Sequence, residues 1–119
     1  MVLKEVMEGQ RLQVVNTGNL EVEVKNGVVS DLLSYIMGCA KEGDLWITIQ
    51  THMNVIAVAS LCKVAAVIIA SNLEIGEDVI KKAYEEGVTV LRSPLSSFEL
   101  TGRLYSLGIK GTLPCDGTA

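Results

Sequence analysis

Residues 41–52 read Lys41-Glu42-Gly43-Asp44-Leu45-Trp46-Ile47-Thr48-Ile49-Gln50-Thr51-His52, and this stretch decides the fold. A polar turn is followed by an apolar run that predicts a buried strand over 45–50, with a polar end. Residues 53–64 are almost wholly apolar and long enough for a helix. A polar cluster therefore follows a strand directly before a helix, where α/β proteins commonly bind ligands.

The same strand-then-helix pattern occurs three times in the second half of the chain. We expect strands at 45–50, 65–70 and 88–91, each followed by a helix, at 53–63, 77–87 and 96–108. Consecutive strand–helix units imply parallel strands with right-handed crossovers. The predicted fold class is α/β, with a mainly parallel sheet flanked by helices. The apolar residues of 53–63 lie on all sides of that helix, so it must be covered on more than one side.

The first half predicts smaller elements. We expect a short helix over 3–8, a strand over 12–15 and a half-exposed strand over 20–25, where apolar and charged residues alternate. Asn26-Gly27 is typical of a hairpin turn, which makes this region a hairpin-like pair. Ser30 and Asp31 favour a helix start. Residues 3–109 are expected to form one domain, and 110–119 a flexible tail.

Composition narrows the function classes. The chain has 119 residues, is 49% hydrophobic and 4% aromatic, and carries a net charge of −4. The absence of a basic stripe argues against nucleic acid binding. No apolar run approaches the roughly 18 residues of a membrane span, and we expect a cytoplasmic protein. One histidine and three cysteines without metal-type spacing predict no metal site and no cofactor.

Three runs together resemble a known family. They are residues 28–34 (VVSDLLS), residues 41–52, and residues 95–99 (LSSFE) with 102–105 (GRLY). They resemble the stand-alone DRTGG-domain proteins over roughly residues 3–109, although the naming five-letter motif is not present literally. That family is similar to the amino-terminal domain of HPr kinase/phosphorylase and, more distantly, to the first domain of Mur ligases. The resemblance implies a small α/β domain that accompanies regulatory modules such as CBS pairs and helps them dimerise.

Polar residues at the predicted strand ends form the candidate site. They are Ser30, Asp31, Gln50, Thr51, His52, Ser71, Asn72, Arg92, Ser93 and Ser96. Arg92 with the backbone N–H groups after Ser96 would suit a phosphate, nucleotide or carboxylate. The alternatives are structural: His52 as a helix-start residue, Ser96 as a helix cap, Ser30 and Asp31 as N-cap residues. Trp46 is a stacking platform, an interface anchor or a packing residue.

Three hypotheses for function stay open. The first is a non-catalytic regulatory or adaptor module that homodimerises, with a possible regulatory protein partner. The second is a sensor of an anionic metabolite or nucleotide at the strand ends. The third is a small enzyme that uses His52. The chain lacks the G-x-x-x-x-G-K-[ST] loop that the HPr kinase route of phosphoryl transfer requires, so kinase activity is not expected.

Overall fold

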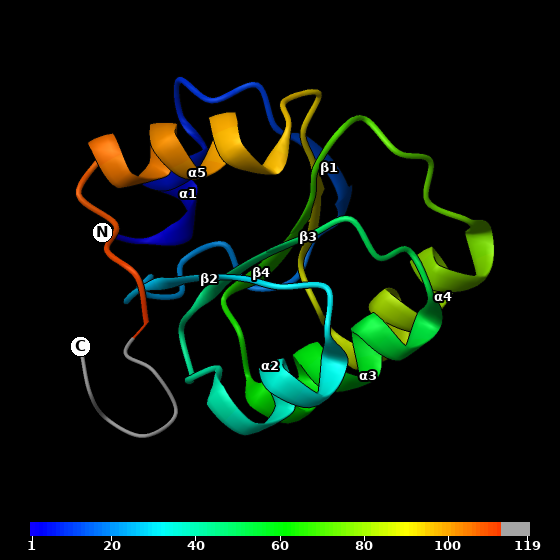
Figure 1. Ribbon diagram of the computed structural model, residues 1–119. Helices are drawn as coiled ribbons and strands as arrows, with labels where there is room; N and C mark the ends of the chain where they lie inside the picture. The colour runs from blue at the N-terminus through cyan, green and yellow to red at the C-terminus, as the bar shows by residue number, and fades with distance from the viewer. Residues whose placement is uncertain (113–119) are drawn as a thin grey trace.

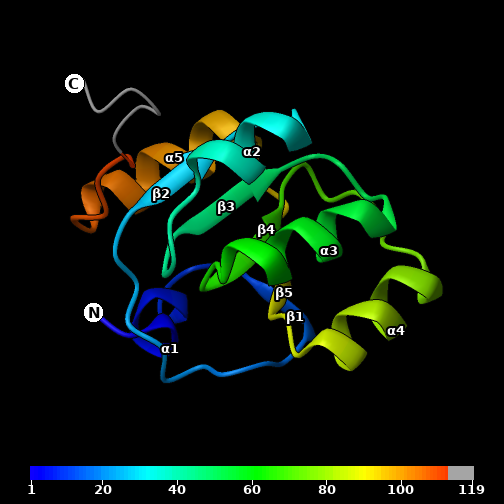
Figure 2. The same cartoon turned by 90° about the horizontal axis from the view of Figure 1, so that it is seen from below.

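The computed structural model describes residues 1–112 and shows a sheet between two layers of helices (Figure 1). The elements are α1 (Leu3–Met7), β1 (Gln13–Asn16), β2 (Gly27–Val29), α2 (Leu33–Cys39), β3 (Leu45–Thr48), α3 (Met53–Cys62), β4 (Ala66–Ile69), α4 (Glu77–Glu86), β5 (Val90–Arg92) and α5 (Ser97–Ser106). The helices α2, α3 and α4 cover one face of the sheet, and α1 and α5 cover the other (Figure 2).

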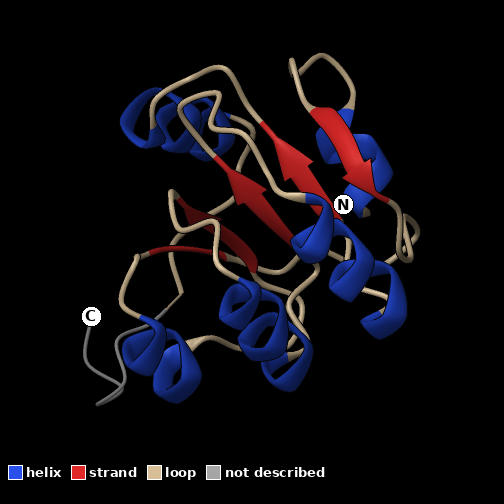
Figure 3. Cartoon of the chain, turned by 90° about the vertical axis from the view of Figure 1, so that its right-hand side faces the viewer, coloured by secondary structure: helices blue, strands red, loops and turns tan. Residues whose placement is uncertain are grey.

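The five strands lie in the order β1-β5-β4-β3-β2. Neighbours from β2 to β5 are parallel, and β1 alone of the five pairs antiparallel, with β5. In Figure 3 the strand nearest the N-terminus accordingly points against its neighbours. Each helix from α2 to α4 connects two adjacent parallel strands, as expected for strand–helix units. The predicted α/β fold with a mainly parallel sheet is confirmed.

The predicted hairpin in the first half is wrong. β1 and β2 lie at opposite edges of the sheet, and Gly27 begins β2 instead of closing a turn. Residues 20–25 are not a strand of the sheet. Their alternation is nevertheless meaningful, because Val24 is buried and Leu20 and Val22 pack against the same core cluster. The backbone N–H of Leu3 donates to Val22 O at 2.9 Å, so this segment pairs with the start of α1.

The strand β3 is buried along its whole length, and Trp46 is fully buried on the side of α2, α3 and α4. Its indole Nε1–H donates to the carbonyl oxygen of Ser30 at 2.8 Å. A buried indole usually needs such a partner. Trp46 is therefore a packing residue that also ties β3 to the end of β2, and the hypothesis of a stacking platform is wrong.

The turn before β3 depends on a glycine. Gly43 is buried and has a φ of +88°, a conformation that side chains other than glycine rarely adopt. A Cβ there would lie 3.1 Å from Lys25 Cγ and 3.2 Å from Glu23 O. The backbone of Gly43 accepts a bond from Lys25 N and donates one to Lys63 O, both at 3.0 Å. The turn thus joins three segments at the start of β3.

The apolar helix α3 lies between α2 and α4, which cover much of its surface (Figure 2). Leu61 stays 66% exposed and Met53 41% exposed. The expectation that the helix needs cover on more than one side is thus met largely within the fold. Its N-cap is His52, which agrees with the helix-start alternative for this residue.

Residues 110–112, which the sequence assigned to a flexible tail, run along the outer edge of β2. Gly27 N–H donates to Lys110 O at 2.8 Å, and Thr112 N–H donates to Gly27 O at 2.9 Å. The Thr112 hydroxyl donates to Asp44 Oδ2 at 2.5 Å. The rest of the predicted tail, 113–119, lies outside the described residues, and the division into domain and tail stays a prediction.

Candidate functional site

The carboxyl ends of the four parallel strands share one edge of the sheet. The register pairs Thr48 with Ile69, and Ile69 with Arg92, so the residues that follow these strands gather along that edge. Nine of the ten predicted site residues lie on the segments that leave this edge, and the tenth, Arg92, is the last residue of β5. The structure thus brings together the segments that sequence reasoning selected. The local bonds of each side chain then indicate what remains available for a ligand.

Asp31 joins the end of β2 to the end of β3. Its Oδ1 accepts the Thr48 hydroxyl at 2.7 Å and the backbone N–H of Ile49 at 2.9 Å. The N-cap of α2 is Leu32, which makes no side-chain cap bond. Ser30 Oγ accepts from Leu32 N–H at 3.1 Å. The expectation of a plain N-cap at Ser30 and Asp31 is therefore wrong: Asp31 is a cross-strand tie and Ser30 stabilises the turn.

His52 is the N-cap of α3. Its Nδ1 accepts from Asn54 N–H at 3.0 Å, which satisfies one of the free donors of the first helical turn. In the neutral imidazole the ring proton then resides on Nε2. The ring is exposed, and Nε2 has no partner within residues 1–112. Nearby, Gln50 Nε2 makes a long 3.4 Å contact to Asp31 O, and Thr51 is half-buried.

Arg92 is largely occupied by the loop between β4 and α4. Its guanidinium donates to Leu73 O at 2.8 Å, to Asn72 O at 2.7 Å and to Gln13 Oε1 at 3.3 Å. Ser71 and Asn72 adopt φ values of +64° and +56°, so the loop turns sharply there. The clamp that Arg92 makes on these carbonyls stabilises that turn. Much of its hydrogen-bonding capacity is therefore already used.

The two serines after β5 have different local roles. Ser93 is 1% exposed, and its Oγ accepts from Leu95 N–H at 3.1 Å. Ser96 is the N-cap of α5 and its Oγ accepts from Glu99 N–H at 3.2 Å, so the predicted capping role is confirmed. The buried Ser93 hydroxyl offers no surface to a ligand. Of this pair, Ser96 lies at the accessible end of the sheet.

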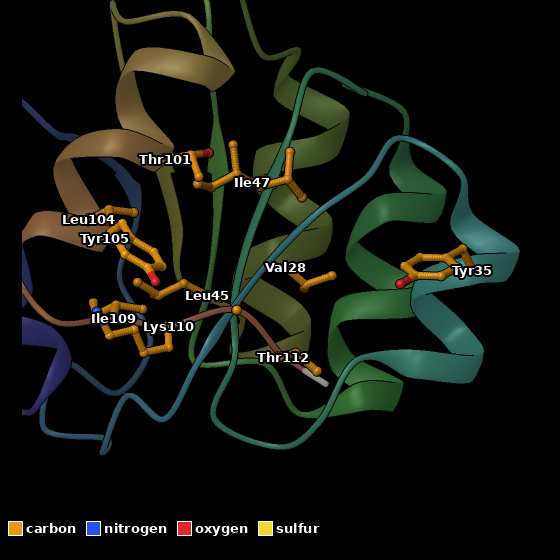
Figure 4. A pocket seen from close by; sticks show the side chains of 13 residues that line it. Val28, Tyr35, Leu45, Ile47, Thr101, Leu104, Tyr105, Ile109, Lys110 and Thr112 are labelled. Carbon is orange, nitrogen blue, oxygen red and sulfur yellow. The ribbon is translucent and has the colours of Figure 1, made fainter. Parts of the chain in front are cut away.

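Two cavities lie elsewhere, around the edge strand β2. One has a volume of about 310 Å³ and is lined by Leu45 and Ile47 from the sheet and by Leu104 and Tyr105 from α5. Figure 4 shows Tyr105, Leu104, Ile109 and Lys110 on one side of the β2 strand and Tyr35 on the other. A second, about 540 Å³, is lined by Val29, Ser97, Phe98, Thr101, Gly102 and Tyr105.

Sequence reasoning missed this region. The available pattern was Phe98, Thr101 and Tyr105, whose spacing of three and four places them on one helical face. That face is distinct from the buried residues Leu100 and Leu104 of the same helix. Lys110 Nζ lies 3.9 Å from the centroid of the Tyr105 ring, so a cation–π contact borders the first cavity. Four cavities of the described chain, two of them beside β2, have only Arg92 of the ten predicted residues in their lining.

The titratable side chains of residues 1–112 offer few groups for metal binding or nucleophilic chemistry. Within residues 1–112, no group of three or more His, Cys, Asp or Glu side chains is placed to hold a metal ion. Asp44, fully buried at the opposite edge of the sheet, has an Oδ1 without a partner in that part of the chain. Burial, with the Asp44 carboxylate as a second cause, raises the pKa of the Cys62 thiol. Cys62 is therefore protonated at neutral pH and a weak nucleophile.

Comparison with known proteins gives a family and a solved structure. The family model described as "DRTGG domain" matches residues 4–107. The crystal structure of the CBS and DRTGG domains of the regulatory region of Clostridium perfringens pyrophosphatase, complexed with the activator diadenosine tetraphosphate, is similar with a TM-score of 0.71 and 20% sequence identity. The match covers 97% of this chain but 48% of that one, so the chain spans about half the length of its structural relative. No curated protein matches the chain.

None of the helices described in residues 1–112 has the length and apolar character of a membrane span.

Proposed function

The chain belongs to the DRTGG domain family, and we propose that it is a non-catalytic regulatory module that acts as a homodimer. The observation that carries this proposal is the set of large apolar side chains that the fold leaves exposed. Phe98 is 86% exposed, Leu32 63% and Tyr105 56%, and these side chains lie beside the edge strand β2. Exposed apolar patches commonly mark protein–protein contacts. Similarity to a regulatory region supports the regulatory role.

Three side chains that could take part in catalysis, those of His52, Asp31 and Cys62, support a non-catalytic role. His52, the one histidine, uses Nδ1 to cap α3, and the carboxylate of Asp31 is bonded to β3. The Cys62 thiol has a raised pKa, which disfavours a thiolate nucleophile. The sequence has no phosphate-binding loop for phosphotransfer. A relationship to the HPr kinase amino-terminal domain stays a prediction.

Sedimentation equilibrium on the purified chain tests the homodimer. The chain mass is 12.8 kDa, so we expect twice that mass in the micromolar range and dissociation on dilution. A dissociation constant of 1 μM corresponds to about 8.2 kcal/mol of association free energy. A monomer throughout a concentration series up to about 100 μM, near 5.5 kcal/mol by the same relation, would contradict the homodimer.

A second candidate function is the binding of a nucleotide or another anionic metabolite at the strand ends. What supports it is that the similar regulatory region was crystallised with diadenosine tetraphosphate. On this chain His52 Nε2 is exposed without a partner in residues 1–112, and it lies at the edge that Ser71, Asn72 and Ser96 share. These residues, with Gln50 and Thr51, would contact the anion.

Thermal unfolding with added nucleotides tests this second candidate. A ligand at 100 times its dissociation constant stabilises the folded state by about 2.7 kcal/mol, so the melting temperature should rise by several degrees. Probes are inorganic phosphate, ATP and diadenosine tetraphosphate. The matched variant is His52→Asn, because asparagine also caps helices well but lacks the second ring nitrogen. The expected result is a weaker shift in this variant. No shift with any probe removes the candidate.

A further inference from the structure

We propose that the second copy docks on the open edge of β2, with Val29 of each protomer paired across a two-fold axis and Phe98 and Tyr105 covering the junction. This inference rests on the proposed homodimer and adds the surface that forms it. Three observations carry it: unpaired backbone groups at Val29, a register restricted by residues 110–112, and apolar side chains on both sides of the strand.

The backbone of Val29 faces outward. Leu45 N–H donates to Asn26 O at 2.8 Å and Ser30 N–H donates to Ile47 O at 3.3 Å, so the even-numbered residues here bond to β3. The N–H and C=O of Gly27 point the other way, to Lys110 and Thr112. By the alternation of a strand, the N–H and C=O of Val29 point the same way as those of Gly27. Neither has a partner within residues 1–112. An unpaired edge of this kind is a template for another strand.

Only Val29 offers unpaired backbone groups at the open edge of β2. Such a short edge favours pairing with a second copy of the chain over binding of an extended peptide. A peptide that adds a strand gains its affinity from several main-chain hydrogen bonds, but Gly27 is already occupied. In an antiparallel pair, two opposed residues exchange both of their N–H···O bonds. When the opposed residues are the same residue, the two-fold axis passes between them, as an isologous dimer requires. Val29 therefore satisfies its two groups with its own copy.

Apolar side chains flank this edge on both faces of the sheet. On the α5 side, Phe98, Tyr105 and the 47% exposed Val29 line the cavity of about 540 Å³. On the α2 side, Leu32 is 63% exposed and Tyr35 43% exposed. Figure 2 shows α2 and α5 at the same end of the molecule as β2. A partner at this edge would cover residues from both layers.

The exposed area is close to what a stable dimer needs. Aromatic side chains bury roughly 150–250 Å² each, so Phe98, Tyr105 and Tyr35 at their observed exposures offer about 300–450 Å². Val29 and Leu32 add to this, and so does Ile49, which is 45% exposed. A standard interface buries about 800 Å² per partner, of which somewhat more than half is apolar. The surface around β2 supplies most of that apolar share.

Sedimentation equilibrium of two matched charge variants tests the docking surface. Phe98→Glu places a carboxylate in the proposed interface, and Tyr84→Glu makes the same change on α4, where the side chain is 78% exposed and far from β2. Because both side chains are exposed, both variants should fold, with circular dichroism spectra like that of the unsubstituted chain. We expect Phe98→Glu to raise the dimer dissociation constant at least tenfold and Tyr84→Glu to change it less than threefold.

The results for the two variants test the β2 docking surface separately from the homodimer itself. A dimer that Phe98→Glu leaves intact overturns the β2 surface, and so does a dimer that Tyr84→Glu disrupts instead, while the homodimer itself stands in both cases. A monomer of the unsubstituted chain overturns both proposals. Hydrogen exchange adds a second measure: the Val29 amide should be protected above the dissociation constant and exchange freely below it. A Val29 amide that exchanges freely in the dimer contradicts the pairing.

Discussion

Replacing Trp46 by alanine is expected to destabilise the protein by about 3–5 kcal/mol, the usual cost of truncating a fully buried tryptophan. The side chain is 0% exposed and lies at the centre of the core on the side of α2, α3 and α4. Its removal leaves a cavity and takes the hydrogen-bond donor from Ser30 O. Since domains of this size are stable by only about 5–15 kcal/mol, much of the total would be lost.

The measurement is thermal or urea unfolding followed by circular dichroism, because fluorescence disappears with the lone tryptophan. We expect the melting temperature of Trp46→Ala to fall by roughly 10–30 °C. Trp46→Phe is the matched control: it keeps most of the apolar volume and loses the indole N–H, so its loss should be clearly smaller. An alanine variant as stable as the unsubstituted chain would mean that Trp46 does not pack as described.

The second large effect is expected at Asp31. Substitution by alanine removes the acceptor for the Thr48 hydroxyl and for Ile49 N–H, and Thr48 is itself fully buried. Hydrogen bonds to charged groups contribute about 1.5–3 kcal/mol. Because Asp31 is largely exposed to water, we expect a total loss of about 1.5–3 kcal/mol and not twice that.

Urea unfolding of Asp31→Ala and Asp31→Asn measures this effect. The asparagine side chain retains a carbonyl oxygen that can accept both bonds, so this variant should keep more than half of the lost stability. A loss below about 0.5 kcal/mol in Asp31→Ala, the range of an ordinary surface substitution, would contradict the cross-strand tie. In that case a reduced response to nucleotides would favour Asp31 as a ligand contact, the role in which the sequence selected it.

The sheet was predictable because its central strands and their helices have strong local patterns. Residues 65–70 form a continuous apolar run, which suits a parallel strand buried on both faces. Gly87 closes α4 in the left-handed conformation and Ser96 caps α5, as their sequence positions indicated. The edge strand β1 agrees with the strand expected over 12–15, but the pairing of the edge segments was not predictable from periodicity. Alternation at 20–25 correctly marks a half-buried extended segment, but the partner of such a segment is set by tertiary packing.

The polar strand ends were predicted to lie along one edge of the sheet, but their local hydrogen bonds were not predictable from the sequence. Parallel strand order alone brings the ends of β3, β4 and β5 to one edge, so their polar residues were expected to lie together. Sequence does not reveal that Arg92 already donates to the loop carbonyls of Asn72 and Leu73. It equally does not reveal the exposure of Phe98, because residues 98, 101 and 105 resemble an ordinary amphipathic face until their surroundings are known.

In the proposed homodimer, two copies of the chain meet at Val29 of β2. Isotope-filtered NMR on an equal mixture of labelled and unlabelled chain measures this contact directly. We expect intermolecular nuclear Overhauser effects from Val29 of the labelled copy to Val29 and Phe98 of the unlabelled copy, since opposed residues of such a pair have Cα atoms about 5.5 Å apart. Intermolecular contacts confined to Leu61 and Tyr84 on α3 and α4, with none at Val29, would contradict it.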